Sequence, residues 1–214
     1  MINSLMKSEI NNYIHKFIQN EKSNFVAVLF HGTGGDENSL VNLAMASLPK
    51  MNILSLRGKV KENGMNRFFR RVEEGIFDMN DLFFRTDEIY NFIKSAKETY
   101  SFNDKRLIAL GYSNGANIIT SILFKYPQIF AAAILLRPML PFQPTEKINL
   151  NNKPILILSS PYDEIIPTTL TLKLINMLNS FNSYLTIQWM ESGHALTYQD
   201  VKEIRAWFNA LDWE

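Results

Sequence analysis

The chain contains six short, almost uninterrupted apolar runs, each bounded by turn-forming residues. Runs without the polar alternation of a half-exposed strand are typical of parallel β-strands that are buried on both faces. Their length and their flanking residues favour strands over helices. The runs are Phe25–Phe30, Asn52–Leu56, Arg106–Leu110, Ala131–Leu136, Pro154–Ser159 and Tyr184–Trp189.

Stretches in which apolar residues recur at helical spacing lie between these runs. They are Asn38–Leu48, Asp81–Tyr100, Asn114–Lys125, Thr168–Leu178 and Leu196–Leu211. This alternation predicts an α/β fold, with a mostly parallel central sheet and helices on both faces. Residues 1–20 fit either a helix or an antiparallel edge strand. Ligands bind beyond the C-terminal ends of the strands in such sheets, so chemistry is expected in the loops after the runs.

Composition narrows the class of protein. The 214 residues fit one domain spanning 1–214, since single domains hold about 50–250 residues. The absence of cysteine excludes disulfides, thiolate metal sites and a cysteine nucleophile. Lys and Arg number 22 against 21 Asp and Glu, so no strong field attracts nucleic acid or an anionic membrane. No signal-peptide run or membrane span is apparent, and we expect a cytoplasmic protein.

The segment Gly111–Gly115 reads G-Y-S-N-G and stands between an apolar run and a predicted helix. In a G-x-S-x-G turn the serine sits on a tight, strained bend, and the glycines let the strand and the helix approach closely. The serine hydroxyl is thereby exposed above the sheet. A surface turn with two glycines would have the same letters, but the strand and helix context favours Ser113 as a nucleophile.

A serine hydroxyl needs a neighbouring base, which is usually histidine. The chain has three histidines. His15 precedes the first of the six predicted strands and should lie far from the active edge, and His31 belongs to another motif. His194 follows the last run in a loop at the correct edge, in the sequence order serine, acid, histidine. His194 is therefore the predicted base, against the alternative of a helix-capping or surface histidine.

The acid should follow a strand between those of Ser113 and His194, where it can orient the imidazole. Asp163 follows the fifth run and is the predicted acid. Glu164 is its adjacent competitor, and Asp200 is a weaker candidate because it falls inside the last helix. A simple turn-forming role for Asp163 is the structural alternative.

The glycine-rich segment His31–Glu37 follows the first run. Backbone N–H groups in such a loop can stabilise the negative charge that develops on a reacting carbonyl oxygen. We expect the Thr33 and Asn114 N–H groups to form this oxyanion hole, with His31 supporting the loop. A phosphate-binding loop is the rival interpretation, but no lysine follows the glycines as a P-loop requires.

With these residues in place, the chain resembles the phospholipase/carboxylesterase branch of the α/β-hydrolases. It is most similar to small bacterial carboxylesterases, including hydrolases linked to hydroquinone or quinone stress. The resemblance spans nearly the whole chain. Its segments are FHGTGGDEN (30–38), LRGKV (56–60), NGMNRFFRRVEEGIFDMNDL (63–82), GYSNGAN (111–117), RPMLP (137–141), DEIIP (163–167) and SGHAL (192–196).

The resemblance implies a cofactor-independent, metal-free esterase with Ser113, Asp163 and His194 as its catalytic triad. It also implies oxyanion donors at Thr33 and Asn114. The chain departs from the family in the acid loop: Ser160 and Glu164 stand where relatives commonly have Gly and Pro.

The stretch from Leu56 to Asp81 begins at the end of a strand and should wall the active site. Candidate pocket residues are Arg57, Phe68, Arg70, Arg137 and Met139. An arginine here could select an acidic or phenolic substrate, but a loop held by arginine–carboxylate pairs and phenylalanine packing is the favoured interpretation. No large lid insertion fits in the chain, so small, accessible esters are expected.

The sequence thus predicts a serine carboxylesterase that hydrolyses short-acyl or aromatic esters through an acyl-enzyme on Ser113. A thioesterase or acyl-protein deacylase would use the same triad. A binding protein for a small aromatic ligand is a third interpretation, and the intact triad weighs against it. The expected partner is a small ester, and a homodimer is compatible with the sequence.

Overall fold

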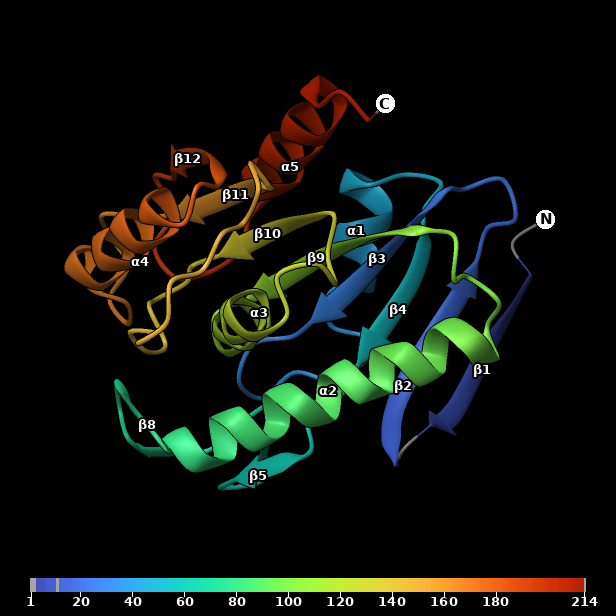
Figure 1. Ribbon diagram of the computed structural model, residues 1–214, viewed down its shortest axis with the longest axis horizontal. Coiled ribbons are helices and arrows are strands. Elements are labelled where there is room, and N and C mark those ends of the chain that lie inside the picture. The colour runs from blue at the N-terminus through green and yellow to red at the C-terminus, as the bar shows by residue number, and fades with distance from the viewer. Residues whose placement is uncertain (1–2, 11, 214) are drawn as a thin grey trace.

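A computed structural model describes residues 3–10 and 12–213 and places eight strands in one central sheet. The strand order is β1-β2-β4-β3-β9-β10-β11-β12 (Figure 1). These strands are β1 (Asn3–Ile10), β2 (Tyr13–Gln19), β3 (Phe25–Phe30), β4 (Asn52–Leu56), β9 (Arg106–Tyr112), β10 (Ala132–Leu136), β11 (Pro154–Ser159) and β12 (Tyr184–Trp189).

The six strands from β4 to β12 are parallel, whereas β1 and β2 are antiparallel at one edge. The predicted α/β fold with a mostly parallel sheet is confirmed. The structure also decides between the two interpretations of the N-terminal segment. Tyr13, His15 and Phe17 alternate with more exposed neighbours along β2. This period of two is that of a strand with one covered face.

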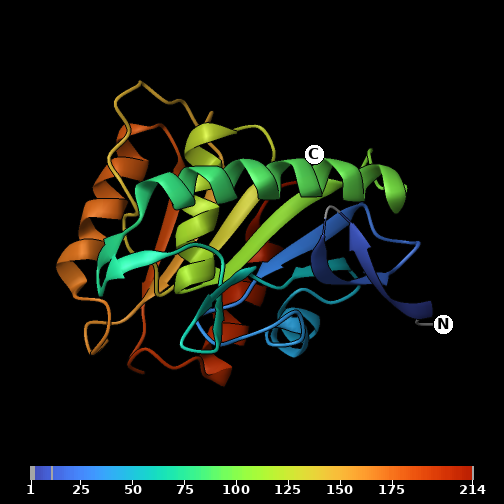
Figure 2. The ribbon, with the colours of Figure 1, turned by 90° about the horizontal axis from the view of Figure 1, so that it is seen from below.

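Five helices in the described chain cover both faces of the sheet: α1 (Val41–Ser47), α2 (Met79–Thr99), α3 (Asn114–Lys125), α4 (Thr168–Ser180) and α5 (Tyr198–Ala210). Figure 2 shows α2 and α3 on one side of the sheet and α1 and α5 on the other. None of the helices in this part of the chain is both long enough and apolar enough to cross a membrane.

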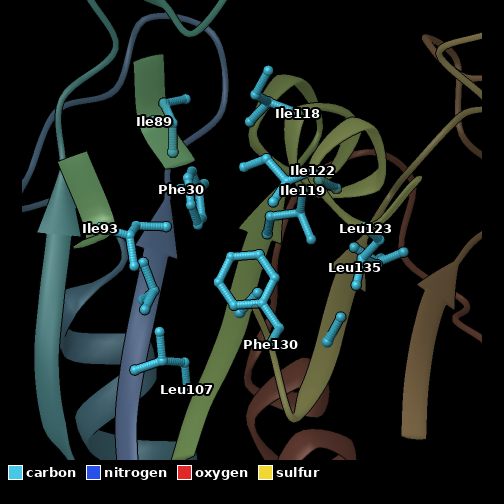
Figure 3. Close-up of a cluster of buried hydrophobic side chains, with 14 of the residues drawn as sticks. Phe30, Ile89, Ile93, Leu107, Ile118, Ile119, Ile122, Leu123, Phe130 and Leu135 are labelled. Carbon is cyan, nitrogen blue, oxygen red and sulfur yellow. The ribbon is translucent and has the colours of Figure 1, made fainter. Parts of the chain in front are cut away.

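Each face of the sheet has its own apolar core, because side chains alternate along every strand. Within β3, Val26, Val28 and Phe30 face the α2 and α3 side, while Ala27 and Leu29 face α1 and α5. Figure 3 shows Phe30 among side chains of α2 and α3 and of the neighbouring strands. The strands are thus covered on both faces, which explains their continuous apolar sequence.

Four short strands follow β4 and form two small hairpins: β5 (Val60–Glu62) with β6 (Met65–Arg67), and β7 (Arg71–Glu73) with β8 (Ile76–Phe77). β5 and β8 lie beside the N-terminal half of α2 (Figure 1). We call residues 57–78 the wall segment. It starts where β4 ends, at the same edge as the loops after the other parallel strands.

Candidate active site

Ser113 occupies the turn between β9 and α3 with backbone angles φ 51° and ψ −113°. A non-glycine residue rarely adopts a positive φ, and such strain persists only where the surroundings hold it. A Cβ atom on Gly115 would lie 2.0 Å from the carbonyl oxygen of Phe30, and one on Gly111 would lie 2.6 Å from that of Gly115. The two glycines therefore allow β9, α3 and β3 to approach closely enough to form the turn.

Asp163 and His194 meet across the ends of β11 and β12. Their atoms Oδ2 and Nδ1 are 2.8 Å apart. The second carboxylate oxygen of Asp163 accepts the N–H groups of Ile165 and Ile166, both at 2.8 Å. The Asp163 side chain is fully buried and that of His194 is 15% exposed. The carboxylate is thus fixed from both sides and holds the imidazole by its Nδ1.

The other two acids considered from the sequence lie differently. Among the described contacts, Glu164 has none with His194. Asp200 forms a buried ion pair with Arg137, at 2.7 Å between Oδ1 and Nη1. Of the three acids, Asp163 is the one in hydrogen-bond contact with the imidazole.

A cavity of about 490 Å³ opens at this edge of the sheet. Ser113, His194, Thr33 and Asn114 all line it, so the predicted nucleophile, base and oxyanion donors face one space. Its apolar lining is Phe77, Met139, Ile165, Ile166, Pro167 and Leu170. Concave, mostly apolar sites with a few convergent polar groups are typical of small-molecule binding.

The Thr33 and Asn114 N–H groups have no hydrogen-bond acceptor within the described part of the chain. Asn114 is the first residue of α3, and the N–H groups of a first helical turn have no partner inside the helix. The positive end of the helix dipole also favours negative charge at this point. Both donors are therefore available to an oxyanion in the cavity.

His31 supports the loop that carries Thr33. Its Nδ1 lies 2.6 Å from the carbonyl oxygen of Gly32, and its Nε2 accepts the N–H of Gly58 at 2.9 Å. This pair of contacts fits a neutral ring with its proton on Nδ1. Burial lowers the pKa of His31, in agreement with the neutral form. His31 thus joins the glycine-rich loop to the start of the wall segment.

Four predicted pocket residues lie outside the lining of this cavity, which corrects the expectation from the sequence. Arg57 is held by Glu37, with Nε and Oε2 2.5 Å apart. Arg70 has a side chain that is 63% exposed and pairs with Asp81. Both conform to the favoured interpretation of a loop held by ion pairs.

Phe68 and Arg137 are buried rather than cavity-lining. Phe68 packs against Phe30 and His31, and Arg137 is fully buried in its pair with Asp200. Met139 lies in the lining of the cavity. A residue that follows a strand at the active edge can point inward as readily as toward the ligand, and the sequence did not distinguish these.

The wall segment contributes cavity residues that were not singled out from the sequence. Arg67, Arg71 and Glu74 line the space with Phe77. Arg67 donates from Nη1 to Oγ1 of Thr33 at 2.7 Å, and both arginines bond to the carboxylate of Glu62. Arg67 ends β6 and Arg71 begins β7, so the hairpin structure of this segment is the signal that could have selected them.

The described residues contain no group of three or more histidine or acidic side chains arranged to hold a metal ion. Tyr112 also lines the cavity and donates its hydroxyl to the carbonyl oxygen of His194 at 3.1 Å. Burial is the main cause that raises the pKa of this tyrosine, so it remains a neutral donor.

Comparison with known proteins gives a consistent picture. The family model described as Phospholipase/Carboxylesterase matches residues 14–211. MhqD, a Bacillus subtilis (strain 168) protein named as a hydrolase, is 40% identical over 186 residues, which are 87% of this chain and 93% of that protein.

Solved structures show the same similarity. The Bacillus cereus carboxylesterase is 40% identical with a TM-score of 0.88, and the match covers 92% of this chain and 93% of that one. A carboxylesterase from Mesorhizobium loti is 26% identical with a TM-score of 0.89, covering 97% and 99% of the two chains.

Proposed function

The chain belongs to the phospholipase/carboxylesterase family of α/β-hydrolases, and on this premise we propose that it hydrolyses small carboxylic esters through an acyl-enzyme on Ser113. Membership makes it a hydrolase of the carboxylesterase type. One observation carries the finer proposal: a single cavity is lined by Ser113 and His194, and Asp163 holds the far side of the imidazole.

Acylation follows from this arrangement. Oγ of Ser113 attacks the ester carbonyl carbon while Nε2 of His194 takes the hydroxyl proton, since Nδ1 is engaged by Asp163. The carbonyl oxygen becomes an oxyanion, which accepts the N–H groups of Thr33 and Asn114. His194 then donates the proton to the leaving alkoxide as the carbon–oxygen bond breaks, and the alcohol departs.

Deacylation repeats the sequence with water as the nucleophile. His194 removes a proton from the water, and the tetrahedral intermediate forms in the same oxyanion hole. Collapse of this intermediate returns the proton from His194 to Ser113 Oγ and releases the carboxylic acid. Asp163 stabilises the imidazolium in both half-reactions without itself being protonated.

The cavity supports a preference for short-acyl or aromatic esters. Its volume of about 490 Å³ lies within the range of small-molecule sites. Phe77, Met139 and Leu170 supply apolar contact surface, on which an alkyl or aryl group can be buried. The two arginines of the wall segment leave part of the cavity lining charged, so substrates that are apolar throughout are not favoured.

Hydrolysis of p-nitrophenyl acetate and butyrate by the wild type and by Ser113→Ala tests the proposal. Loss of a triad serine can lower kcat by about 10⁶ where the triad works as a unit, so we expect near-background rates. Ser180→Ala, at the exposed end of α4, is the matched control and should keep wild-type rates. Equal turnover by wild type and Ser113→Ala would refute the nucleophile.

A further inference from the structure

Arg137 follows β10 directly and is the largest fully buried side chain described in the chain. Its guanidinium pairs with Asp200, and both side chains are 0% exposed. A buried ion pair is weak evidence for stability, because apolar residues of similar volume often serve as well. Its backbone angle φ of 51° is a further strain for a non-glycine residue. The buried arginine therefore calls for a reason other than stability.

The remaining bonds of the guanidinium go to the residues on both sides of His194. Nε donates to the carbonyl oxygen of Gly193 at 3.1 Å, and Nη2 donates to that of Ala195 at 3.2 Å. Nη2 also lies 3.0 Å from Oγ of Ser192. The carbonyl oxygen of His194 itself accepts the Tyr112 hydroxyl. Three consecutive carbonyl groups around the base are thus held by side chains.

Leu136 and Arg137 are also bonded to the serine turn and to the strand that leads to Asp163. The carbonyl oxygen of Leu136 accepts the N–H of Ser113 at 2.8 Å. The N–H of Arg137 donates to the carbonyl oxygen of Leu158 in β11 at 2.7 Å, and its Nη1 reaches the same oxygen at 3.3 Å. β11 leads into the loop of Asp163. Leu136 and Arg137 therefore connect the serine turn, the acid strand and the histidine loop.

Asp200 fixes the orientation of the guanidinium. It is the N3 residue of a capping box at the start of α5, and its Oδ2 accepts the N–H of Thr197 at 2.7 Å. The planar guanidinium fork can bond to a carboxylate and to several carbonyl groups at once, whereas a lysine ammonium cannot reproduce that geometry. Through Asp200 and Arg137, α5 therefore fixes the position of the loop that carries His194.

We propose that Arg137, oriented by Asp200, is a positioning residue that holds His194 in line with Ser113. This inference rests on the proposed function of those two residues. Arg137 does not line the cavity and is fully buried, so it acts through the histidine loop and not on the substrate. A misplacement of about 1 Å in a catalytic group can lower the rate by about 10²-fold.

The double variant Arg137→Met/Asp200→Asn removes the fork and leaves no unpaired buried charge. We expect kcat for p-nitrophenyl acetate to fall by about 10²-fold with KM changed by less than about threefold. Arg137→Lys should recover part of kcat, since it restores the charge without the fork. Arg85→Met is the control: Arg85 forms ion pairs with Asp81 and Glu88 on α2, away from the histidine loop.

NMR of the imidazole signals gives a readout that a loss of stability alone would not move. The chain has only three histidines, so His194 can be assigned with His15→Gln and His31→Gln variants. In Arg137→Met/Asp200→Asn the His194 signals should shift and broaden, and the downfield Nδ1 proton bonded to Asp163 should weaken. In Arg85→Met they should stay as in the wild type, even if the melting temperature falls.

A folded Arg137→Met/Asp200→Asn protein with wild-type kcat and wild-type His194 signals would overturn the proposal. If that variant does not fold, Ser192→Ala and Arg137→Lys provide milder forms of the same test. Unchanged kcat and unchanged His194 signals in both would again overturn it. Wild-type protein that fails to hydrolyse the esters, or that is unaffected by Ser113→Ala, would refute the proposed function. The imidazole signals would still report separately on whether Arg137 positions His194.

Discussion

The two sides of the cavity hold their charged residues in different ways. On the histidine side, Arg137 and Asp200 are fully buried and bond to the loop of His194. On the wall side, Arg71 and Glu62 keep 28% and 25% of their side chains exposed. The histidine side is joined to β10, β11 and α5, which are far apart in the sequence. The wall side is made of two hairpins of one continuous segment, in which Arg67 and Arg71 both pair with Glu62.

This difference suits the histidine side to the positioning of catalytic groups and the wall side to the recognition of the substrate. Groups that take part in bond making need a fixed position, and buried, fully bonded surroundings provide it. Residues that contact only the substrate can tolerate small displacements. Val72 and Ile76 of the wall segment are 74% and 51% exposed, so this hairpin has little packing to hold it. We therefore expect substitutions on the histidine side to change kcat, and those on the wall side to change KM.

After Ser113→Ala, the largest effect should come from Asp163→Asn. An amide cannot hold the imidazole in the required tautomer or stabilise its cation, so kcat should fall by about 10⁴. Glu164→Gln is the adjacent control, and it should change kcat by less than about twofold. Steady-state kinetics on p-nitrophenyl acetate give both values. A larger loss in Glu164→Gln than in Asp163→Asn would exchange the roles of the two acids.

The next prediction compares alanine substitutions at two glycines, Gly115 and Gly64. A Cβ on Gly115 would meet backbone atoms of Phe30 and His31, so Gly115→Ala must displace the serine turn. Gly64, at φ 81° in the β5–β6 hairpin, has open space around it. Its replacement by alanine should lower stability by about 1–2 kcal/mol through the left-handed backbone alone.

Both variants should therefore lose stability in denaturant unfolding, but only one of them should lose kcat. Gly115→Ala should lose about 10²-fold in kcat as the nucleophile moves, besides about 1–3 kcal/mol of stability from overpacking. Gly64→Ala should keep its kcat despite a measurable loss of stability. A Gly64→Ala enzyme as inactive as Gly115→Ala would show that the wall is as rigid as the serine turn.

A smaller effect is expected from Arg71→Ala. Arg71 lines the cavity, and its Nε donates to Oε1 of Glu62 at 2.7 Å. Partly exposed ion pairs contribute about 0–1 kcal/mol, which corresponds to at most about fivefold in an equilibrium constant. KM for p-nitrophenyl butyrate should change within that limit while kcat stays near the wild-type value. A fall of 10²-fold in kcat would place Arg71 with the catalytic groups.

The contrast between the two sides also explains what the sequence could predict. Short-range patterns identified the strands and the turn at Ser113, because an apolar run, a G-x-S-x-G turn and a helix follow one another directly. The meeting of His194 and Asp163 at one edge of the sheet could be predicted from their order after later strands. Arg137 was expected in the pocket, but its direction depends on Asp200, which is 63 residues away. Contacts of that range leave no periodic signal in one sequence.

The N-terminal strand and the wall were hard to predict for a related reason. In β2 the apolar residues fit both a period of two and a helical spacing, and pairing with β4 decides the outcome. In the wall, Arg67 and Arg71 reach the cavity only because two tight hairpins return the chain to it. The many charges of this segment indicated ion pairs, but they did not indicate which arginine faces the ligand.

The smallest expected effect is a dependence of stability on pH that arises on the wall side. Burial lowers the pKa of His31, whose Nε2 accepts the N–H of Gly58 at the start of the wall. Below about pH 6.5 the unfolded histidine binds a proton that the folded one resists. The unfolded state then binds more protons, so the free energy of unfolding should fall as the pH is lowered through this range.

Burial lowers the pKa of His15 in the same direction, so a single variant should remove only part of the dependence. Urea unfolding between pH 8 and pH 5 should show a shallower pH slope in His31→Gln than in the wild type. A glutamine amide can accept the Gly58 N–H and donate to the Gly32 carbonyl without titrating. The His15→Gln variant should also show a shallower slope, although His15 lies in β2 and away from the cavity. Identical slopes in wild type and His31→Gln would mean that His31 is as readily protonated in the folded state as in the unfolded one. The link between the glycine-rich loop and the wall would then not depend on a neutral imidazole.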